Sequence, residues 1–151
     1  MPFTYRLQKI LEIRIRKKEE QIQAVLKAQK EVNRIELLIV QNLEQIQKST
    51  EEMKTADPMM FEYYDNFIKH LWKQDEKLKE EKQQAINVLE QEKELLKKRE
   101  QEVNVLEKHK EHQKEDYIQE QKKLELKTLN EIGSQKAFIR RKEKQEEDAS
   151  Q

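Results

Sequence analysis

The feature that most limits the fold of this 151-residue chain is that it contains only one glycine and two prolines. These residue types most often introduce turns, so the chain has few places at which it can reverse direction. Glu, Lys, Gln and Leu are abundant, and they lose little side-chain freedom in a helix. Only 34% of the residues are hydrophobic and 41% are charged, which argues against a thick globular core. The sequence therefore predicts an all-α fold made of long helices.

Apolar residues in the first third of the chain recur at alternating steps of three and four, as in a heptad repeat. Leu26, Ile35 and Leu38 widen this stripe, which indicates more than one neighbour there. The predicted seam consists of Leu11, Ile15, Ile22, Val25, Val32, Ile39, Leu43, Ile46 and Met53, with Lys18, Gln29 and Glu36 as polar interruptions.

The heptad pattern stops at the segment TADP, residues 55 to 58. Asp57 is a typical helix N-cap, and Pro58 suits the first helical turn because its missing N–H would be unpaired there. A second seam then runs from Met60 to Leu124. We expect one coiled-coil domain over residues 1–151, with helices at about 4–55 and 59–144, a turn at about 55–58 and a frayed polar tail at 145–151.

Two heptad helices joined by a short turn can bury their seams against each other, which predicts a long antiparallel two-helix coiled-coil hairpin. A parallel homodimer is the alternative. In the hairpin, a first helix that begins near residue 4 pairs with residues up to about 111, so the C-terminal part of the second helix overhangs. Its apolar residues predict a covering partner, or a bend at Gly133 that folds the helix back. They are Tyr117, Leu124, Leu129, Ile132, Phe138 and Ile139.

Composition and spacing argue against catalysis and against a bound cofactor. The chain has no cysteine, and its single glycine excludes a glycine-rich phosphate loop. Carboxylate pairs are common, but a two-helix rod offers no partly desolvated cleft for acid–base chemistry. His109 and His112 lie one turn apart near Glu111 and Glu115, but with His70 the only other histidine we expect no metal site. The sequence predicts a protein that is not an enzyme.

The formal net charge is zero, with 31 basic and 31 acidic residues, so no global field attracts nucleic acid. The longest aliphatic run, LLIV at 37–40, is too short to span a bilayer, and the start lacks the apolar block of a signal peptide. A soluble cytoplasmic protein without membrane insertion is expected.

Two kinds of exposed surface are predicted to bind protein. The basic clusters RIRKK at 14–18 and RRK at 140–142 lack interleaved aromatic residues, so an acidic protein surface fits them better than nucleic acid. The aromatic segment MMFEYYDNFIKHLW, residues 59–72, places Phe61, Tyr63, Ile68 and Trp72 outside the heptad. These side chains form either a docking surface or the packing of the hairpin tip.

The N-terminal pattern F-x-Y-x-L-Q-x-x-L-x-x-R resembles that of the FliJ family, the stalk-like component of the bacterial flagellar type III export apparatus. It is carried by Phe3, Tyr5, Leu7, Gln8, Leu11 and Arg14. The segment EQKKLELKTLNEIGSQKAFIRR, residues 120–141, is similar to the closing signature of that family. Asn130 and Gly133 depart from it, where Asp and a small helix-forming residue are usual.

The resemblance implies a coiled-coil stalk like that of the rotary ATPase gamma subunit, without cofactors, in flagellum biogenesis and motility. Its implied partners are the hexameric export ATPase, whose ring assembly it promotes, the cytoplasmic domain of the export gate protein, and export chaperones that it escorts. The implied location is cytoplasmic, peripheral to the inner membrane at the flagellar basal body.

By the same resemblance, two groups of residues are expected to contact partners. The expected ATPase-ring contacts are Tyr5, Leu7, Gln8, Leu11, Arg14, Phe138, Arg140 and Arg141, and the expected export-gate contacts are Phe61, Ile68 and Trp72. The alternatives are the stalk of a virulence-type III secretion system, a generic structural coiled-coil dimer and a nucleic-acid-binding arm.

Overall fold

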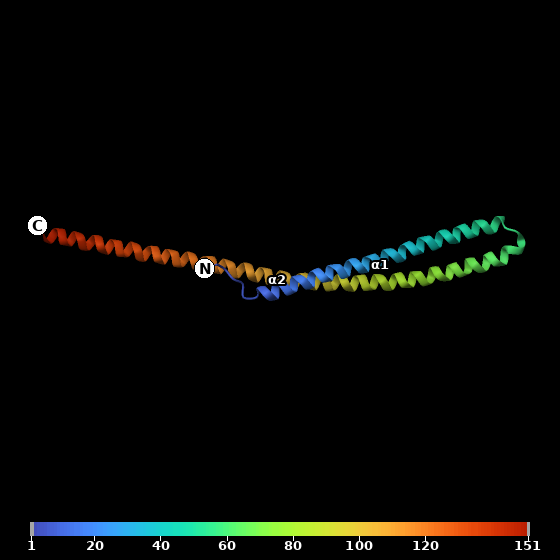
Figure 1. Ribbon diagram of the computed structural model, residues 1–151, viewed down its shortest axis with the longest axis horizontal. Helices are drawn as coiled ribbons and strands as arrows, with labels where there is room; N and C mark the ends of the chain where they lie inside the picture. The colour runs from blue at the N-terminus through green and yellow to red at the C-terminus, as the bar shows by residue number, and fades with distance from the viewer. Residues whose placement is uncertain (1, 151) are drawn as a thin grey trace. The chain divides into compact units, whose positions relative to one another are not determined.

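The computed structural model describes residues 2–150, and Figure 1 shows its two long α-helices. Helix α1 spans Gln8–Thr55, the short 3-10 helix η1 spans Pro58–Met60, and helix α2 spans Phe61–Ala149. No β-strand occurs within residues 2–150. The all-α prediction is therefore confirmed. The chain divides into a central unit, residues 12–103, and a terminal unit, residues 1–11 and 104–151.

The connection between α1 and α2 follows from the residues at the turn. The carboxylate of Asp57 accepts a hydrogen bond from the backbone N–H of Met59 at 3.4 Å, and Pro58 occupies the first position of η1. The N–H of Met60 donates to the carbonyl of Asp57 at 2.8 Å. The side chain and carbonyl of Asp57 thus satisfy N–H groups that are unpaired at a helix start.

Within the central unit, α1 and α2 pack in opposite directions (Figure 1). The amide Nε2 of Gln21 donates to the carbonyl of Glu92 at 2.9 Å, and Nδ2 of Asn42 donates to the carbonyl of Leu71 at 2.9 Å. Residue numbers rise along α1 as they fall along α2, as in antiparallel packing. The buried apolar residues of this interface are Val32, Ile35, Ile46, Leu71, Leu78, Leu89 and Val103.

Every second position of the α1 seam lies one residue earlier than the apolar pattern predicts. Asn42 is buried at 8% exposure, whereas the predicted seam residue Leu43 is 39% exposed. Gln21 and Ile35 are likewise buried, in place of Ile22 and Glu36. Val32 and Ile46 belong to both patterns. An apolar count misses Asn42 because its amide becomes acceptable in the seam only through its hydrogen bond to α2.

Asp75 is the most unusual residue of the seam. It is 2% exposed, its Oδ2 pairs with Nζ of Lys79 at 3.0 Å, and its Oδ1 has no hydrogen-bond partner within the described chain. A buried acceptor without a partner loses its hydration without compensation. Asp75 is therefore expected to destabilise the packed pair of helices.

Replacement of this carboxylate by an apolar side chain should stabilise the protein. We expect Asp75→Leu to raise the free energy of unfolding by about 1 to 2 kcal/mol, because the unpaired oxygen is removed and apolar contact with α1 is gained. Urea denaturation followed by circular dichroism measures the change. Glu76→Leu, at an exposed neighbouring position, is the matched control and should have little effect. An unchanged or lower stability of Asp75→Leu would contradict this interpretation.

The observed helix ends differ from the expected ones in two places. Helix α1 begins at Gln8, four residues after the expected start near residue 4, because the preceding segment packs on α2 through Tyr5 instead of continuing the helix. Helix α2 continues to Ala149, beyond the expected end near 144. Residues 145–149 are mostly Gln, Glu and Ala, which favour helix, and none of them is glycine or proline.

Helix α2 runs without interruption through Gly133. The expected alternative of a bend at this residue, with the helix folding back, is therefore not what the structure shows. Gly133 does not adopt a positive φ, and a Cβ added there would meet no atom within 4 Å. Nothing in the described chain requires glycine at this position.

The substitution Gly133→Ala should therefore strengthen the C-terminal part of α2 by about 1 kcal/mol, since alanine loses less backbone entropy in a helix. Amide hydrogen exchange across residues 126–140 should slow. Ala137→Gly, one turn later, is the reciprocal control and should speed exchange in the same segment. Equal exchange in all three proteins would contradict the expectation.

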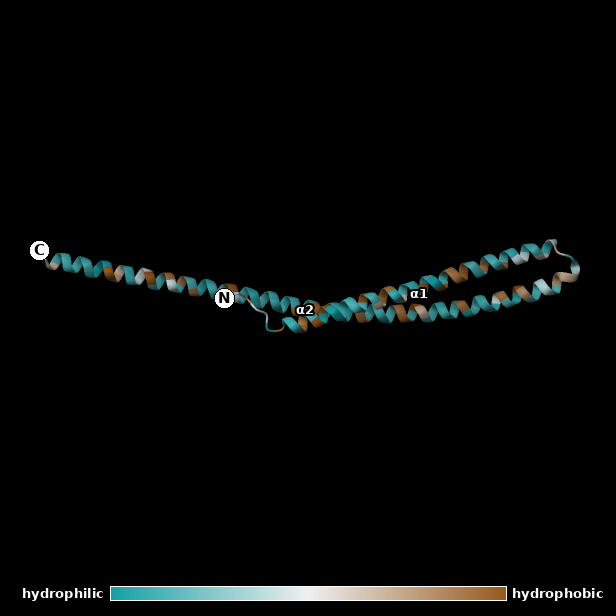
Figure 2. Cartoon of the chain, in the orientation of Figure 1, coloured by the Kyte–Doolittle hydropathy of each residue, from teal (hydrophilic) through white to brown (hydrophobic). Residues whose placement is uncertain are grey.

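Apolar residues occur along both helices in short groups separated by hydrophilic ones (Figure 2). Accordingly, no helix within residues 2–150 is both long and apolar enough to cross a membrane.

Candidate protein interaction surfaces

The N-terminal segment is attached to α2 through Tyr5, which is 9% exposed. Its hydroxyl lies 2.6 Å from Nδ1 of His109 and donates to the carbonyl of Leu106 at 3.4 Å. The rings of Phe3 and Tyr117 also pack at 5.6 Å between centroids. These contacts lie within the terminal unit, and they tie residues 3–5 to one face of α2.

The structure places the expected ATPase-contact residues of the N-terminal motif in different environments. Tyr5 and Leu11 are buried, Leu11 at 3% exposure, so their side chains serve packing within the chain. Leu7 and Gln8 are half-buried, and Nζ of Lys110 donates to Oε1 of Gln8 at 2.8 Å. Arg14 belongs to the central unit, where its guanidinium donates to the carbonyl of Glu102 at 3.5 Å.

The expected contact residues near the C-terminus are all accessible. Phe138 is 68% exposed, and Arg140 and Arg141 are exposed as well. Every residue from 122 to 150 is exposed, so no other part of the described chain covers this segment of α2. Its large exposed apolar residues are Leu124, Leu126, Leu129, Ile132, Phe138 and Ile139.

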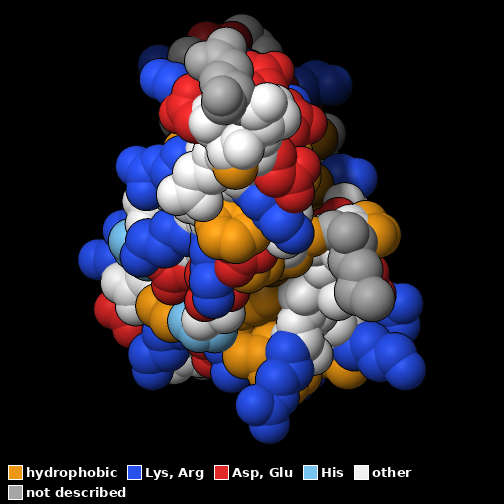
Figure 3. Space-filling model, turned by 90° about the vertical axis from the view of Figure 1, so that its left-hand side faces the viewer, with side chains coloured by type: hydrophobic (Ala, Val, Ile, Leu, Met, Phe, Trp, Pro, Cys, Tyr) orange, Lys and Arg blue, Asp and Glu red, His pale blue; other side chains and the backbone are white. Residues whose placement is uncertain are grey.

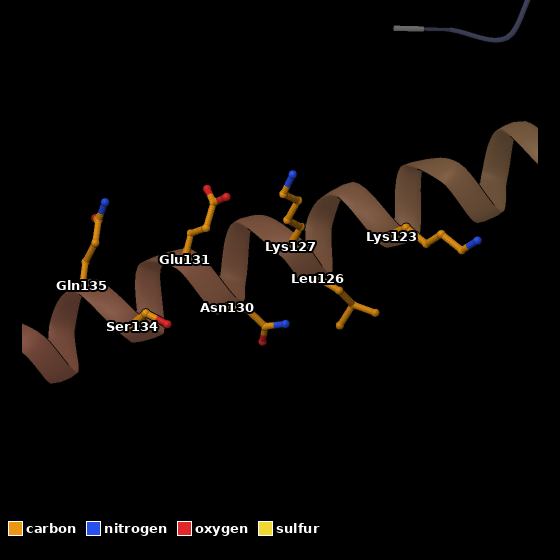
Figure 4. A pocket seen from close by; sticks show the side chains of 7 residues that line it. All are labelled: Lys123, Leu126, Lys127, Asn130, Glu131, Ser134 and Gln135. Carbon is orange, nitrogen blue, oxygen red and sulfur yellow. The ribbon is translucent and has the colours of Figure 1, made fainter.

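The shallow hollows along residues 123–139 are lined by side chains of α2 alone. Figure 4 shows Leu126, Asn130 and Ser134 pointing to one side of α2 and Lys127, Glu131 and Gln135 to the other, all into open space. Because no second element stands opposite them in this view, they do not enclose a small-molecule site. The segment instead offers a long helical surface to another macromolecule.

The expected gate-contact residues Phe61, Ile68 and Trp72 lie on one face of α2 near its start. Ile68 and Trp72 follow Phe61 by 7 and 11 residues, which are close to two and three helical turns. Phe61 is 39% exposed, Trp72 is 48% exposed, and Ile68 is half-buried. Asp65 lies on the same face and forms an ion pair with Lys69 at 2.8 Å, which raises the pKa of Lys69 through a side-chain hydrogen bond.

Two accessible residues near the turn were not among the expected gate contacts, although Tyr63 belongs to the aromatic segment predicted to form a docking surface or the packing of the hairpin tip. Met59 is 89% exposed and Tyr63 is 62% exposed, with the ring of Tyr63 stacked on Phe67 at 6.5 Å. The position of Tyr63 outside the heptad was the available signal for its exposure. Met59 lies in η1, where heptad spacing gives no information.

The histidines do not form a metal site in the described part of the chain. Nδ1 of His109 is engaged by Tyr5, and residues 2–150 contain no group of three or more His, Cys, Asp or Glu side chains that could hold an ion. The contact between His109 and Tyr5 joins residues 104 positions apart, so sequence spacing alone could not assign it.

Charged side chains of both signs surround exposed apolar ones in the space-filling view (Figure 3). Such mixed surfaces suit protein partners better than a polyanion, which requires clustered positive charge. Comparison with known proteins decides which class of protein this is. A family model described as Flagellar FliJ protein matches residues 3–143.

The chain belongs to the FliJ family. As a FliJ family member, it is a protein of flagellar type III export, and the family is a structural, non-catalytic export component. The match spans both units and includes the N-terminal attachment at Tyr5 as well as the exposed segment up to residue 143. Searches of curated proteins and of solved structures gave no match.

The attachment of the N-terminal segment can be tested with Tyr5→Phe, which keeps the ring and removes the hydroxyl. Loss of the hydrogen bonds to His109 and Leu106 should weaken the attachment by about 1 kcal/mol. Tryptic cleavage after Arg6, followed by mass spectrometry, should become several-fold faster. Tyr117→Phe is the control, because the hydroxyl of Tyr117 has no hydrogen-bond partner within residues 2–150. Equal cleavage rates in Tyr5→Phe and the parent protein would contradict a role of the hydroxyl.

Proposed function

We propose that this FliJ family protein is the coiled-coil stalk of the flagellar export ATPase, an antiparallel hairpin resembling the stalk of the rotary ATPase gamma subunit. It binds the hexameric ATPase, favours the assembled ring over free subunits, and links the ring to the cytoplasmic domain of the export gate. It also escorts export chaperones. Its place of action is the cytoplasmic side of the inner membrane at the flagellar basal body.

The observation that carries this proposal is the uncovered C-terminal segment of α2. Residues 122–150 are all exposed, yet they include six large apolar side chains and the basic pair Arg140 and Arg141. Apolar side chains at this density are characteristic of protein contacts. A ring of subunits with acidic loops would cover the apolar residues and pair with the arginines at once.

Exposure supports some of the proposed ring contacts more than others. Phe138, Arg140 and Arg141 are free to touch a partner, whereas Tyr5 and Leu11 act by holding the N-terminal segment and α1 in place. Leu7, Gln8 and Arg14 remain proposed contacts through their half-exposed parts. Phe61, Ile68 and Trp72 are the proposed gate contacts, of which Phe61 and Trp72 present the most surface.

The proposed mechanism requires no chemistry on this protein. A ligand that binds the assembled ring better than the separate subunits shifts the assembly equilibrium by mass action. Higher ATP hydrolysis follows if the active sites lie between subunits of the ring. The protein then acts through differential binding alone.

The deciding experiment measures ATP hydrolysis and ring formation by the flagellar export ATPase of the same organism, with and without a stoichiometric amount of this protein. Stimulation and co-elution in gel filtration are expected. Phe138→Ala should weaken binding by about 2 kcal/mol, roughly 30-fold, because a large apolar contact is lost. Reversal of both charges in Arg140→Glu/Arg141→Glu should also lower stimulation.

Val105→Ala is the matched control for Phe138→Ala. Val105 is 64% exposed on the same helix but lies outside the proposed contact segment, residues 122–150. Circular dichroism should show equal helicity in all variants. An active ATPase that neither responds to the protein nor co-elutes with it would overturn the proposal, and equal losses in both alanine variants would overturn the assignment of Phe138.

A further inference from the structure

Polar side chains in the seam of the central unit are concentrated toward the turn. We divide the unit into a tip part, residues 42–75, which includes the turn, and a root part, residues 12–41 and 76–103. The buried residues of the root part are Val32, Ile35, Leu78, Leu89 and Val103, with Gln21 as the polar one. Those of the tip part are Ile46 and Leu71, with Asn42, Ser49 and Asp75 as the polar ones. Polar residues therefore hold most of the buried positions in the tip part, where they contribute little of the apolar burial that stabilises helix pairs.

Few polar contacts join the two helices in the tip part. Within residues 2–150, the bond from Nδ2 of Asn42 to the carbonyl of Leu71 at 2.9 Å is the only hydrogen bond or ion pair between α1 and α2 there. Ser49 is 1% exposed, but its hydroxyl accepts from Gln45 of its own helix at 3.3 Å. In the root part the side chains of α1 that bond to α2 are Arg14, Gln21 and Glu36.

Asp75 adds a cost to the closed form of the tip part. Its Oδ1 is buried without a hydrogen-bond partner in the described chain, and its Oδ2 pairs with Lys79 of the same helix. Separation of α1 from α2 at this point would return both oxygens to water and restore the hydration that burial removes. Opening of the tip part thus sacrifices the packing of Ile46 and Leu71, but it relieves the unpaired oxygen of Asp75.

The helical segments of the tip part are short. Residues 42–55 of α1 and 61–75 of α2 contribute about 15 residues each, and a helix of that length is marginal in water without tertiary packing. Each segment has the other as its packing partner, so separation removes the support of both at the same time. The root part keeps its own buried apolar residues and its three bonded side chains of α1.

We infer that the tip part opens as one unit while the root part stays paired. Such a sub-global opening has a lower free energy than complete unfolding. It uncovers Ile46 and Leu71, so the open tip offers more apolar surface than the closed pair. A partner that binds the open form more tightly would shift the protein toward it. The inference concerns the free protein and does not rest on the proposed function.

The test is amide hydrogen exchange of the full chain at increasing urea concentrations below the unfolding transition, read by mass spectrometry of peptides. Protection factors in residues 44–53 and 62–70 should be about tenfold or more below those in residues 28–35 and 88–100. Exchange in the tip part should also depend less on urea, because its opening exposes less surface than complete unfolding does.

Two variants assign the buried residues to their units. Asp75→Leu should slow exchange in the tip part about tenfold, because the unpaired oxygen is removed. Glu76→Leu, at the exposed neighbouring position, is its control and should leave exchange unchanged. Leu89→Ala should speed exchange in the root part about tenfold or more, yet leave the tip part within about twofold, because Leu89 stays packed when only the tip opens.

Equal protection and equal urea dependence in the two parts would overturn the inference, because the helices would then separate only together. The same conclusion would follow if Leu89→Ala accelerated both parts by one factor. Unchanged tip exchange in Asp75→Leu would remove Asp75 from the opening unit and with it the proposed cause. Asp75→Leu is expected to be more stable than the parent protein, so the urea series on these two proteins decides the question even if Leu89→Ala fails to fold.

Discussion

The contact on which the structure depends is a single antiparallel seam between two helices in the central unit. Each helix can bury only a narrow stripe against one neighbour, so the remaining faces stay in contact with solvent. Val32 and Ile35 on α1, with Leu78 and Leu89 on α2, supply much of the buried apolar surface. The fold therefore exposes apolar side chains wherever the sequence has more of them than one seam can hold. These surplus side chains are where partners are expected.

The seam also contains polar residues, which limits how the helices can pair. Gln21 and Asn42 each donate to a backbone carbonyl of α2, and Ser49 receives a hydrogen bond from Gln45. A rotation of α2 that turned these carbonyls away would leave Gln21 and Asn42 buried without acceptors, at a cost of about 1 to 3 kcal/mol for each group. Backbone carbonyls recur along α2, so the two amides constrain which helix faces meet more than they constrain the heptad register.

The helical character and the turn could be predicted from the sequence because both depend on local signals. One glycine and two prolines leave long helices as the only economical outcome, and Asp57 before Pro58 marks the start of η1. Every second residue of the α1 seam was harder to predict from the sequence. Either Asn42 or Leu43 can be buried at one of these positions, and the structure buries Asn42. The choice depends on a carbonyl of α2 that is 29 residues away. Apolar spacing contains no information about that acceptor.

The same reasoning explains why the surfaces were only partly predictable. Trp72 is exposed because the heptad leaves it outside the seam, a local property, whereas Phe138 is exposed because no other part of the described chain covers residues 122–150. Tyr5 and Leu11 share the N-terminal motif with Leu7, but they are buried by contacts with residues about a hundred positions later or by the seam itself. A motif identifies residues that matter to a family without separating those that hold the fold from those that meet a partner. That separation required the packing around each side chain.

The polar and narrow seam has a consequence for how this protein responds to temperature. The heat capacity change of unfolding increases with the apolar surface exposed, and it averages about 12 to 15 cal/mol/K per residue in globular proteins. Few residues of this chain are buried, and Gln21, Asn42, Ser49 and Asp75 are among them. The heat capacity change per residue should therefore be smaller than the globular average. The stability curve is then flatter, and the helices melt over a wide range of temperature, with little tendency toward cold denaturation.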